Sequence, residues 1–72
     1  MNDGLDIKVG DRVRPDDELW AAFRQLGIRT RRTVTVEDVA DRPSAGDLDG
    51  GTERFIKRNG IWGRARGFEV VR

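Results

Sequence analysis

The chain has 72 residues, with 14 lysines and arginines against 13 aspartates and glutamates, and it contains neither cysteine nor histidine. Their absence excludes disulfides, the common zinc sites and the Ser-His or Cys-His pairs of nucleophilic catalysis. No apolar run is long enough to cross a bilayer and no signal-peptide pattern is present, so we expect a single cytoplasmic domain over residues 1–72 without membrane contact.

The basic residues are concentrated near the carboxyl end of the chain. Residues 54–72 hold six basic residues and one acidic residue, which gives this segment a net charge of +5 in a chain of net charge +1. Residues 40–53, by contrast, carry a net charge of −3. This asymmetry indicates a polyanionic partner, and the alternative is that the acidic segment folds over the basic one and neutralises it.

The first part of the chain predicts a short strand and then a helix. Residues 1–6 are polar and are expected to be frayed, and a strand is predicted around residues 11–14. Pro15 and the three acidic residues after it mark the start of a helix that Gly27 ends, so we predict a helix over residues 15–26. Its apolar stripe, which we expect to cover the open side of a small sheet, consists of Leu19, Trp20, Phe23 and Leu26.

Residues 28–39 are rich in β-branched side chains and alternate cleanly, which predicts one long, half-buried strand. Val34 and Val36 share its apolar face. Three arginines stand at the start of this segment, and they either join a basic surface or keep an edge strand from pairing with other chains. They are Arg29, Arg31 and Arg32.

Residues 40–51 predict a loop, because they contain Pro43, three glycines and several small polar residues. Asp47 and Asp49 in this loop weakly resemble a calcium-binding loop, but the remaining oxygen ligands of such a loop are missing. We therefore interpret the segment as an acidic turn and expect neither a metal ion nor a cofactor.

Asn59-Gly60 is the strongest local signal in the chain. Two segments with strand-forming residues flank it, and a two-residue type I′ turn needs positive φ at both central positions, which Asn and Gly tolerate best. We therefore predict a hairpin over residues 52–66, followed by a tight turn at 65–67 and a last strand at 68–71. The predicted cross-strand pairs are Arg58 with Ile61, Lys57 with Trp62, Ile56 with Gly63, Phe55 with Arg64 and Arg54 with Ala65.

The two faces of this hairpin differ in composition. One face carries the aliphatic residues Ile56 and Ile61 and is expected to face the core. The other face combines two aromatic residues with three cations: Phe55, Lys57, Trp62, Arg64 and Arg66. Large aromatic side chains are scarce in so small a chain and are usually buried, so we favour burial of the two aromatics. The alternative is an exposed platform that stacks bases and neutralises phosphates.

Three segments carry a resemblance to a known group of folds. They are Val9-Gly10-Asp11-Arg12-Val13-Arg14, Thr33-Val34-Thr35-Val36-Glu37 and Arg64-Ala65-Arg66-Gly67-Phe68-Glu69-Val70-Val71. With them the chain resembles small SH3-like β-barrels, in particular the KOW-type half of that group, and it is similar to tiny uncharacterised proteins of actinobacterial phages. The resemblance implies a mainly β fold, a partly open barrel of about five strands with one short helix inserted after the first strand. A winged helix, with the hairpin as its wing, is the rival fold.

Two function hypotheses follow from these patterns. The first is a nucleic-acid-binding accessory module, acting in the host cytoplasm if it is phage-encoded, on DNA or RNA. Its expected phosphate contacts are Lys57, Arg58, Arg64 and Arg66, with Arg31 and Arg32 nearby and Trp62 stacking on a base. The alternative is a protein-interaction module that docks on a host protein or on its own copies through Trp20 and Phe23 of the helix and through edge strands. We expect no enzymatic activity, because no candidate catalytic constellation is present.

Overall fold

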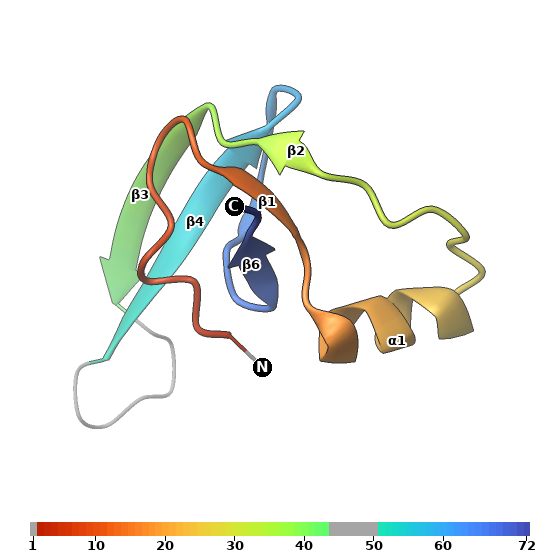
Figure 1. Ribbon diagram of the computed structural model, residues 1–72. Helices are drawn as coiled ribbons and strands as arrows, with labels where there is room; N and C mark the ends of the chain where they lie inside the picture. Colours follow the sequence, from red (N-terminus) through yellow and green to blue (C-terminus); the bar gives the residue numbers. More distant parts are fainter. Residues whose placement is uncertain (1, 44–50) are drawn as a thin grey trace.

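The computed structural model describes residues 2–43 and 51–72, which form six strands and one helix (Figure 1). In chain order these are β1 (Arg12–Pro15), α1 (Asp17–Gln25), β2 (Val34–Thr35), β3 (Asp38–Pro43), β4 (Thr52–Arg58), β5 (Ile61–Arg64) and β6 (Phe68–Val70). The strands make two antiparallel three-stranded sheets, ordered β2-β1-β6 and β3-β4-β5. The predicted mainly β class with one helix after the first strand is confirmed, but the described strands do not close into a barrel.

The prediction of one long strand over residues 28–39 was wrong in its extent. Only β2 and the start of β3 fall in this range, and the two strands belong to different sheets. Val36 and Glu37 connect the two sheets. The Val36 N–H donates to the Asp11 carbonyl oxygen beside β1 at 2.9 Å, and the Glu37 N–H donates to the Lys57 carbonyl oxygen of β4 at 2.8 Å.

The loop predicted over residues 40–51 was also wrong at its beginning, because β3 continues to Pro43. β3 pairs with β4 along its whole length, from Asp38 opposite Lys57 to Pro43 opposite Thr52. Asp41 and Arg54 face each other in this ladder and form a two-pronged ion pair with N–O distances of 2.7 and 2.9 Å. Cross-strand pairing therefore overrides the loop-like composition. The acidic turn expected around Asp47 and Asp49 lies outside the described residues.

The predicted hairpin is confirmed together with its register. Asn59 and Gly60 have φ values of 51° and 76°, as a type I′ turn requires, and the Gly60 N–H donates to Oε1 of Glu37 at 2.7 Å. The four pairs nearest the turn are the predicted ones, from Arg58 opposite Ile61 to Phe55 opposite Arg64.

The favoured interpretation of the hairpin faces was wrong for its largest side chain. Trp62 is 46% exposed and Phe55 is half-buried, whereas Ile56 is fully buried. Ile61, expected in the core with Ile56, is 69% exposed, because it stands beside the turn, beyond the end of the packed region. The aliphatic face therefore points inward, and the aromatic face is the wetter one.

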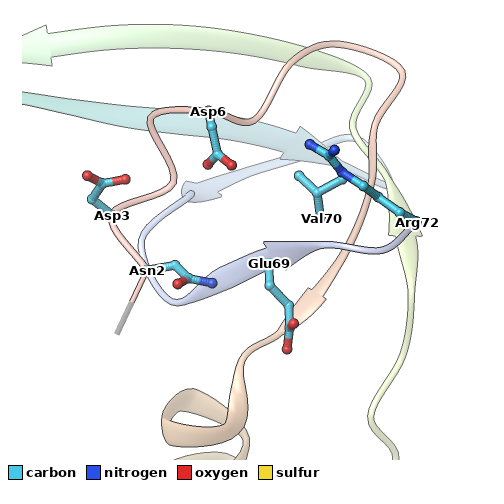
Figure 2. Close-up of a pocket in the computed structure, with 6 residues that line it drawn as sticks. All are labelled: Asn2, Asp3, Asp6, Glu69, Val70 and Arg72. Carbon is cyan, nitrogen blue, oxygen red and sulfur yellow. The ribbon is translucent and has the colours of Figure 1, made fainter.

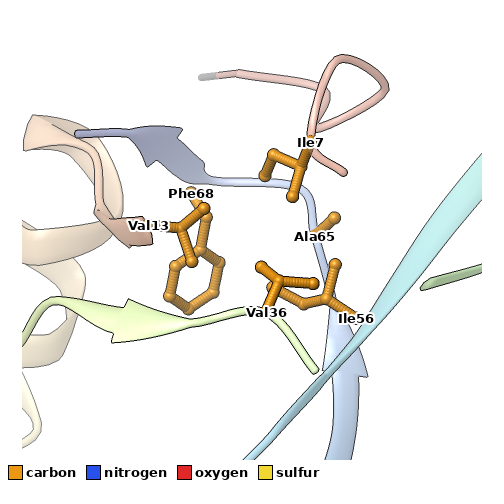
Figure 3. Packing of buried hydrophobic residues seen from close by; sticks show 6 residues of the cluster. All are labelled: Ile7, Val13, Val36, Ile56, Ala65 and Phe68. Carbon is orange, nitrogen blue, oxygen red and sulfur yellow. The ribbon is translucent and has the colours of Figure 1, made fainter. Parts of the chain in front are cut away.

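The core lies between the two sheets and is small (Figure 3). Its buried members are Ile7, Val13, Val36, Ile56, Ala65 and Phe68. Each comes from a different segment, so that no single strand carries the core alone. Burial of such aliphatic and aromatic side chains stabilises the fold by about 1.5–3 kcal/mol each.

Ile7 reaches the core because the segment before β1 is held in place, in contrast to the frayed end expected for residues 1–6. Nη1 of Arg54 donates to the carbonyl oxygens of Leu5 and Ile7, both at 2.8 Å. Gly4 is buried with a φ of 78°, and a Cβ atom there would lie 2.6 Å from the Cβ of Ala65. The segment therefore forms one wall of the core.

The helix α1 lies to one side of the sheets, directly after β1 (Figure 1). Its N-cap is Asp16, whose Oδ1 accepts a hydrogen bond from the Leu19 N–H at 2.8 Å, and its first turn is acidic as predicted. Gly27, with a φ of 89°, ends it. None of its residues is fully buried, and Leu19 packs partly against the core. The helix thus covers the sheet less completely than its stripe predicts.

Candidate functional site

Two adjoining depressions lie between the helix side of the molecule and the end of the hairpin. The first has a volume of about 410 Å³ and is lined by Pro15, Phe23, Ile28, Arg29, Thr30, Arg32, Val34, Arg58, Asn59 and Phe68. The second has a volume of about 540 Å³ and is lined by Leu19, Phe23, Arg58, Arg64, Arg66 and Phe68. Phe23, Arg58 and Phe68 line both depressions, so the two are neighbours, and together we call them the basic groove.

Arg58 stands at the junction of the two depressions because of its position in β4. Side chains alternate across a strand, so Arg58 points to the same side as the buried Ile56, two residues before it. Its guanidinium carbon lies 4.5 Å from the centroid of the Phe68 ring, within cation–π range. A Cβ atom on Gly63 would come within 3.0 Å of the Arg58 Nη2, so the missing side chain at this position leaves room for the guanidinium group.

The Arg58 guanidinium is partly withdrawn from water. Its Nε atom is buried and has no hydrogen-bond partner, and burial lowers the pKa of this group below its usual value. An arginine remains charged at neutral pH even so. A buried donor without a partner costs about 1–3 kcal/mol, so a shift of the Arg58 side chain that brings this N–H to an acceptor would be favourable.

Four further arginines line the basic groove, two in each depression. Arg29 and Arg32 come from the segment before β2 and are exposed. Arg64 from β5 and Arg66 from the following turn are exposed as well. Of these four, only Arg64 has an ion pair with a described residue, Glu53, at an Nε–Oε1 distance of 3.2 Å. No aspartate or glutamate lines either depression, so the groove carries five positive charges without a carboxylate among its lining residues.

Arg31, predicted beside Arg32 as a phosphate contact, is engaged elsewhere in the structure. Its Nε and Nη2 atoms donate to the Pro15 carbonyl oxygen at 2.9 and 2.7 Å. Its Nη2 also contacts carboxylate oxygens of Glu69 at 2.9 Å and of Asp17 at 3.2 Å. These contacts fasten the segment before β2 to β1 and β6, so Arg31 positions the neighbouring arginines.

Trp62 and Lys57, the remaining predicted contacts, stand outside the basic groove. Trp62 lies in a separate depression of about 340 Å³ with Ala40, Arg42 and Phe55, and it stands on the face of the hairpin opposite Arg58. The guanidinium carbon of Arg42 lies 5.4 Å from the centroid of the Phe55 ring. Lys57 is half-buried and faces Trp62 across the ladder. The structure therefore separates the tryptophan from most of the predicted cations.

The residues of the alternative protein-interaction surface are both half-buried on α1. Phe23 lines both depressions of the basic groove, whereas Trp20 precedes it by about one turn. The sequence pattern assigns neither Phe23 nor Phe68 to a basic surface, because both belong to apolar patterns that predict core. Only the three-dimensional arrangement places these rings beside Arg58.

A further depression, of about 520 Å³, lies near the two ends of the chain and is lined by Asn2, Asp3, Asp6, Glu69, Val70 and Arg72 (Figure 2). Figure 2 shows that the carboxylates of Asp3, Asp6 and Glu69 point in different directions and do not converge. In residues 2–43 and 51–72 no group of three or more acidic side chains is placed to hold a metal ion.

Comparisons with known proteins add no relative. A scan against protein-family models, a search of curated proteins and a search of solved structures each gave no match. Within the described part of the chain, no helix has the length and apolar character needed to cross a membrane. The functional interpretation therefore depends on the geometry of the groove.

Proposed function

We propose that this chain is a non-enzymatic binding module that contacts nucleic acid through the basic groove. The observation that carries the proposal is that five arginines, of which Arg64 is also paired with Glu53, line two depressions without any lining carboxylate. Arg58, Arg64, Arg66 and Arg32 of this set are also among the residues that the sequence pattern suggested. Binding of polyanions by such surfaces is dominated by phosphate neutralisation and the release of counterions.

We further propose that the two sheets are an open form of the SH3-like arrangement. The sheet orders β2-β1-β6 and β3-β4-β5, with β2 and β3 separated by two residues, support this relation. The long connection after β1 contains α1, Arg29 and Arg32, and the two arginines line a depression together with Arg58 and Asn59 of the hairpin. Small barrels of this kind carry many functions, so the proposal of nucleic-acid binding depends on the groove and not on the fold.

The proposal is tested by fluorescence anisotropy with labelled DNA and RNA oligonucleotides of mixed sequence. We expect binding at about 50 mM salt and a linear fall of log K with log salt concentration, with a slope of about −0.7 to −0.9 per neutralised phosphate. Replacing Arg29 and Arg32 with glutamine removes two groove cations and should make the slope shallower by about 1.4–1.8.

The matched control removes the same charge from another place. Lys8 and Arg12 are exposed and line neither depression, so the double glutamine variant at these positions has the same net charge as the Arg29/Arg32 variant. The proposal is wrong if the slope of log K against log salt concentration changes equally in both double variants. It is also wrong if no oligonucleotide binds at low salt.

The protein-interaction alternative is supported by one specific observation. Leu26 at the end of α1 is 78% exposed and Ile28 just after it is 42% exposed, so apolar surface continues beyond the helix stripe. A protein partner on this surface would associate in a manner insensitive to salt. Self-association is checked by light scattering across a concentration series, where a Leu26→Gln variant that abolishes it would favour this function.

A further inference from the structure

We propose that the basic groove accommodates an unpaired nucleotide, so that the protein prefers single-stranded to double-stranded nucleic acid. This inference rests on the proposed function and names the form of nucleic acid that the groove recognises. It follows from three features of the groove: its apolar lining residues, the half-buried Arg58 beside Phe68, and the outer arginines that line each depression.

Half of the residues that line the first depression are apolar: Pro15, Phe23, Ile28, Val34 and Phe68. Its volume of about 410 Å³ falls in the range of pockets that enclose small ligands, about 300–1,000 Å³. A duplex keeps the faces of its bases inside the stack and presents phosphates, so it offers no apolar surface to these side chains. An unpaired base can place its π-face against the half-buried Phe23 ring.

Arg58 is a half-buried cation whose position suits a flexible strand better than a rigid duplex. Its Nε atom is shielded from solvent and lacks a partner, and its guanidinium group rests on the Phe68 ring. A flexible single strand can insert a base edge or a phosphate oxygen to reach it, and guanidinium planes also stack on bases. Asn59 and Thr30 line the same depression and supply further hydrogen-bonding groups for a base edge.

The outer arginines are divided between the two ends of the groove. Arg29 and Arg32 line the first depression and Arg64 and Arg66 line the second, with Arg58 common to both. A strand that crosses the groove can therefore place phosphates at both ends while one base enters between them. A positively charged groove with an aromatic contact is the arrangement that single-strand binding proteins use.

The experiment uses the 72-residue chain and compares an unpaired oligonucleotide with a duplex of the same sequence and length. We expect the single strand to bind at least tenfold more tightly at the same salt concentration. Phe23→Ala should weaken single-strand binding about tenfold without changing the salt slope, because stacking carries no charge. Phe23→Leu preserves more of the apolar packing but should show a similar loss of single-strand affinity. Phe23→Trp keeps an aromatic ring and should retain the wild-type affinity.

Trp62→Ala is the matched aromatic control, because Trp62 is exposed and lies in a different depression. Trp62→Ala should leave the affinities for the single strand and for the duplex unchanged. If the duplex binds as tightly as the single strand, or if Phe23→Leu binds as the wild type does while remaining folded, the inference is overturned and the proposed function stands. If neither form binds at low salt, the inference and the proposed function both fail.

Discussion

Asp16 joins the start of the helix to the amino-terminal segment, and its removal should destabilise the protein strongly. The side chain is 8% exposed, its Oδ1 accepts from the Leu19 N–H at 2.8 Å and its Oδ2 accepts from the Asn2 N–H at 3.0 Å. Loss of an N-cap costs about 1 kcal/mol. Loss of a second hydrogen bond to a charged group adds about 1 kcal/mol, because the exposed Asn2 N–H regains water.

Asp16→Ala should therefore lower the free energy of unfolding by about 2 kcal/mol. A chain of 72 residues has a total stability of roughly 4–11 kcal/mol, so this is a large fraction. The expected fall in Tm is about 8–16 °C. Urea titration followed by tryptophan fluorescence and thermal melting by circular dichroism both measure it. Asp17→Ala is the control, because the Asp17 side chain is 96% exposed and should contribute less than about 0.5 kcal/mol.

The effect should depend on pH in a defined direction. Burial alone would raise the pKa of Asp16, but the N–H groups of Leu19 and Asn2 outweigh it and lower the pKa below its usual value of 3.8. The stabilisation is therefore complete above that usual value and disappears as the pH falls through the pKa of the folded state. The stability difference between wild type and Asp16→Ala should shrink below about pH 4. Equal losses in Asp16→Ala and Asp17→Ala at pH 7 would refute this account.

Three further substitutions test other parts of the structure. Gly63→Ala should change the unfolding free energy by less than about 0.5 kcal/mol. The new Cβ would come within 3.0 Å of Nη2 at the end of the Arg58 side chain and displace its guanidinium from Phe68. Oligonucleotide binding, measured in anisotropy titrations, should therefore weaken severalfold. An affinity equal to wild type would contradict the role of Arg58. Gly4→Ala should cost about 2–4 kcal/mol in urea titrations, because the added Cβ would meet Ala65 at 2.6 Å in a backbone conformation with a φ of 78°. A wild-type urea midpoint would show that the amino-terminal segment does not pack as described. Arg31→Met should cost about 1–3 kcal/mol in thermal melts and leave the salt slope of binding unchanged, because its guanidinium is bonded to Pro15 and Glu69. A shallower slope would mean that Arg31 does contact phosphate.

The hairpin could be predicted from the sequence because its determinants are local. Asn59 and Gly60 tolerate positive φ, and a two-residue turn then fixes the register of both strands. The helix start is equally local, since Asp16 caps it within its own first turn. The expected place of Pro15 at the first helical position was wrong, because Pro15 is the last residue of β1 and pairs with Phe68. Residues 40–43 of β3 were predicted as loop because their pairing depends on a distant partner. Asp41 pairs with Arg54, thirteen positions later, and its own segment has a composition typical of loops.

The wet face of the hairpin could not be settled from alternation alone. A period of two separates Ile56 from Trp62 but does not say which side meets the core. Ile7 and Val36 determine which face is buried, because they reach the interior from other segments and pack in one cluster with Ile56. The basic groove could not be predicted for a similar reason, since Phe23 and Arg58 belong to distant segments and meet only after folding. Alternation placed Arg58 on the inner face, but its contact with Phe68 depends on the tight turn before β6.

The fastening of the amino-terminal segment by Arg54 has a practical consequence for handling the protein. Shortened forms that begin at β1 would lose Ile7 and expose Val36 and Ile56 to water, while the Arg54 guanidinium would lose two of its carbonyl acceptors. Such fragments should be prone to aggregation and proteolysis. Labels, immobilisation tags and fusion partners belong after Arg72, whose side chain is exposed and makes no contribution to the buried cluster.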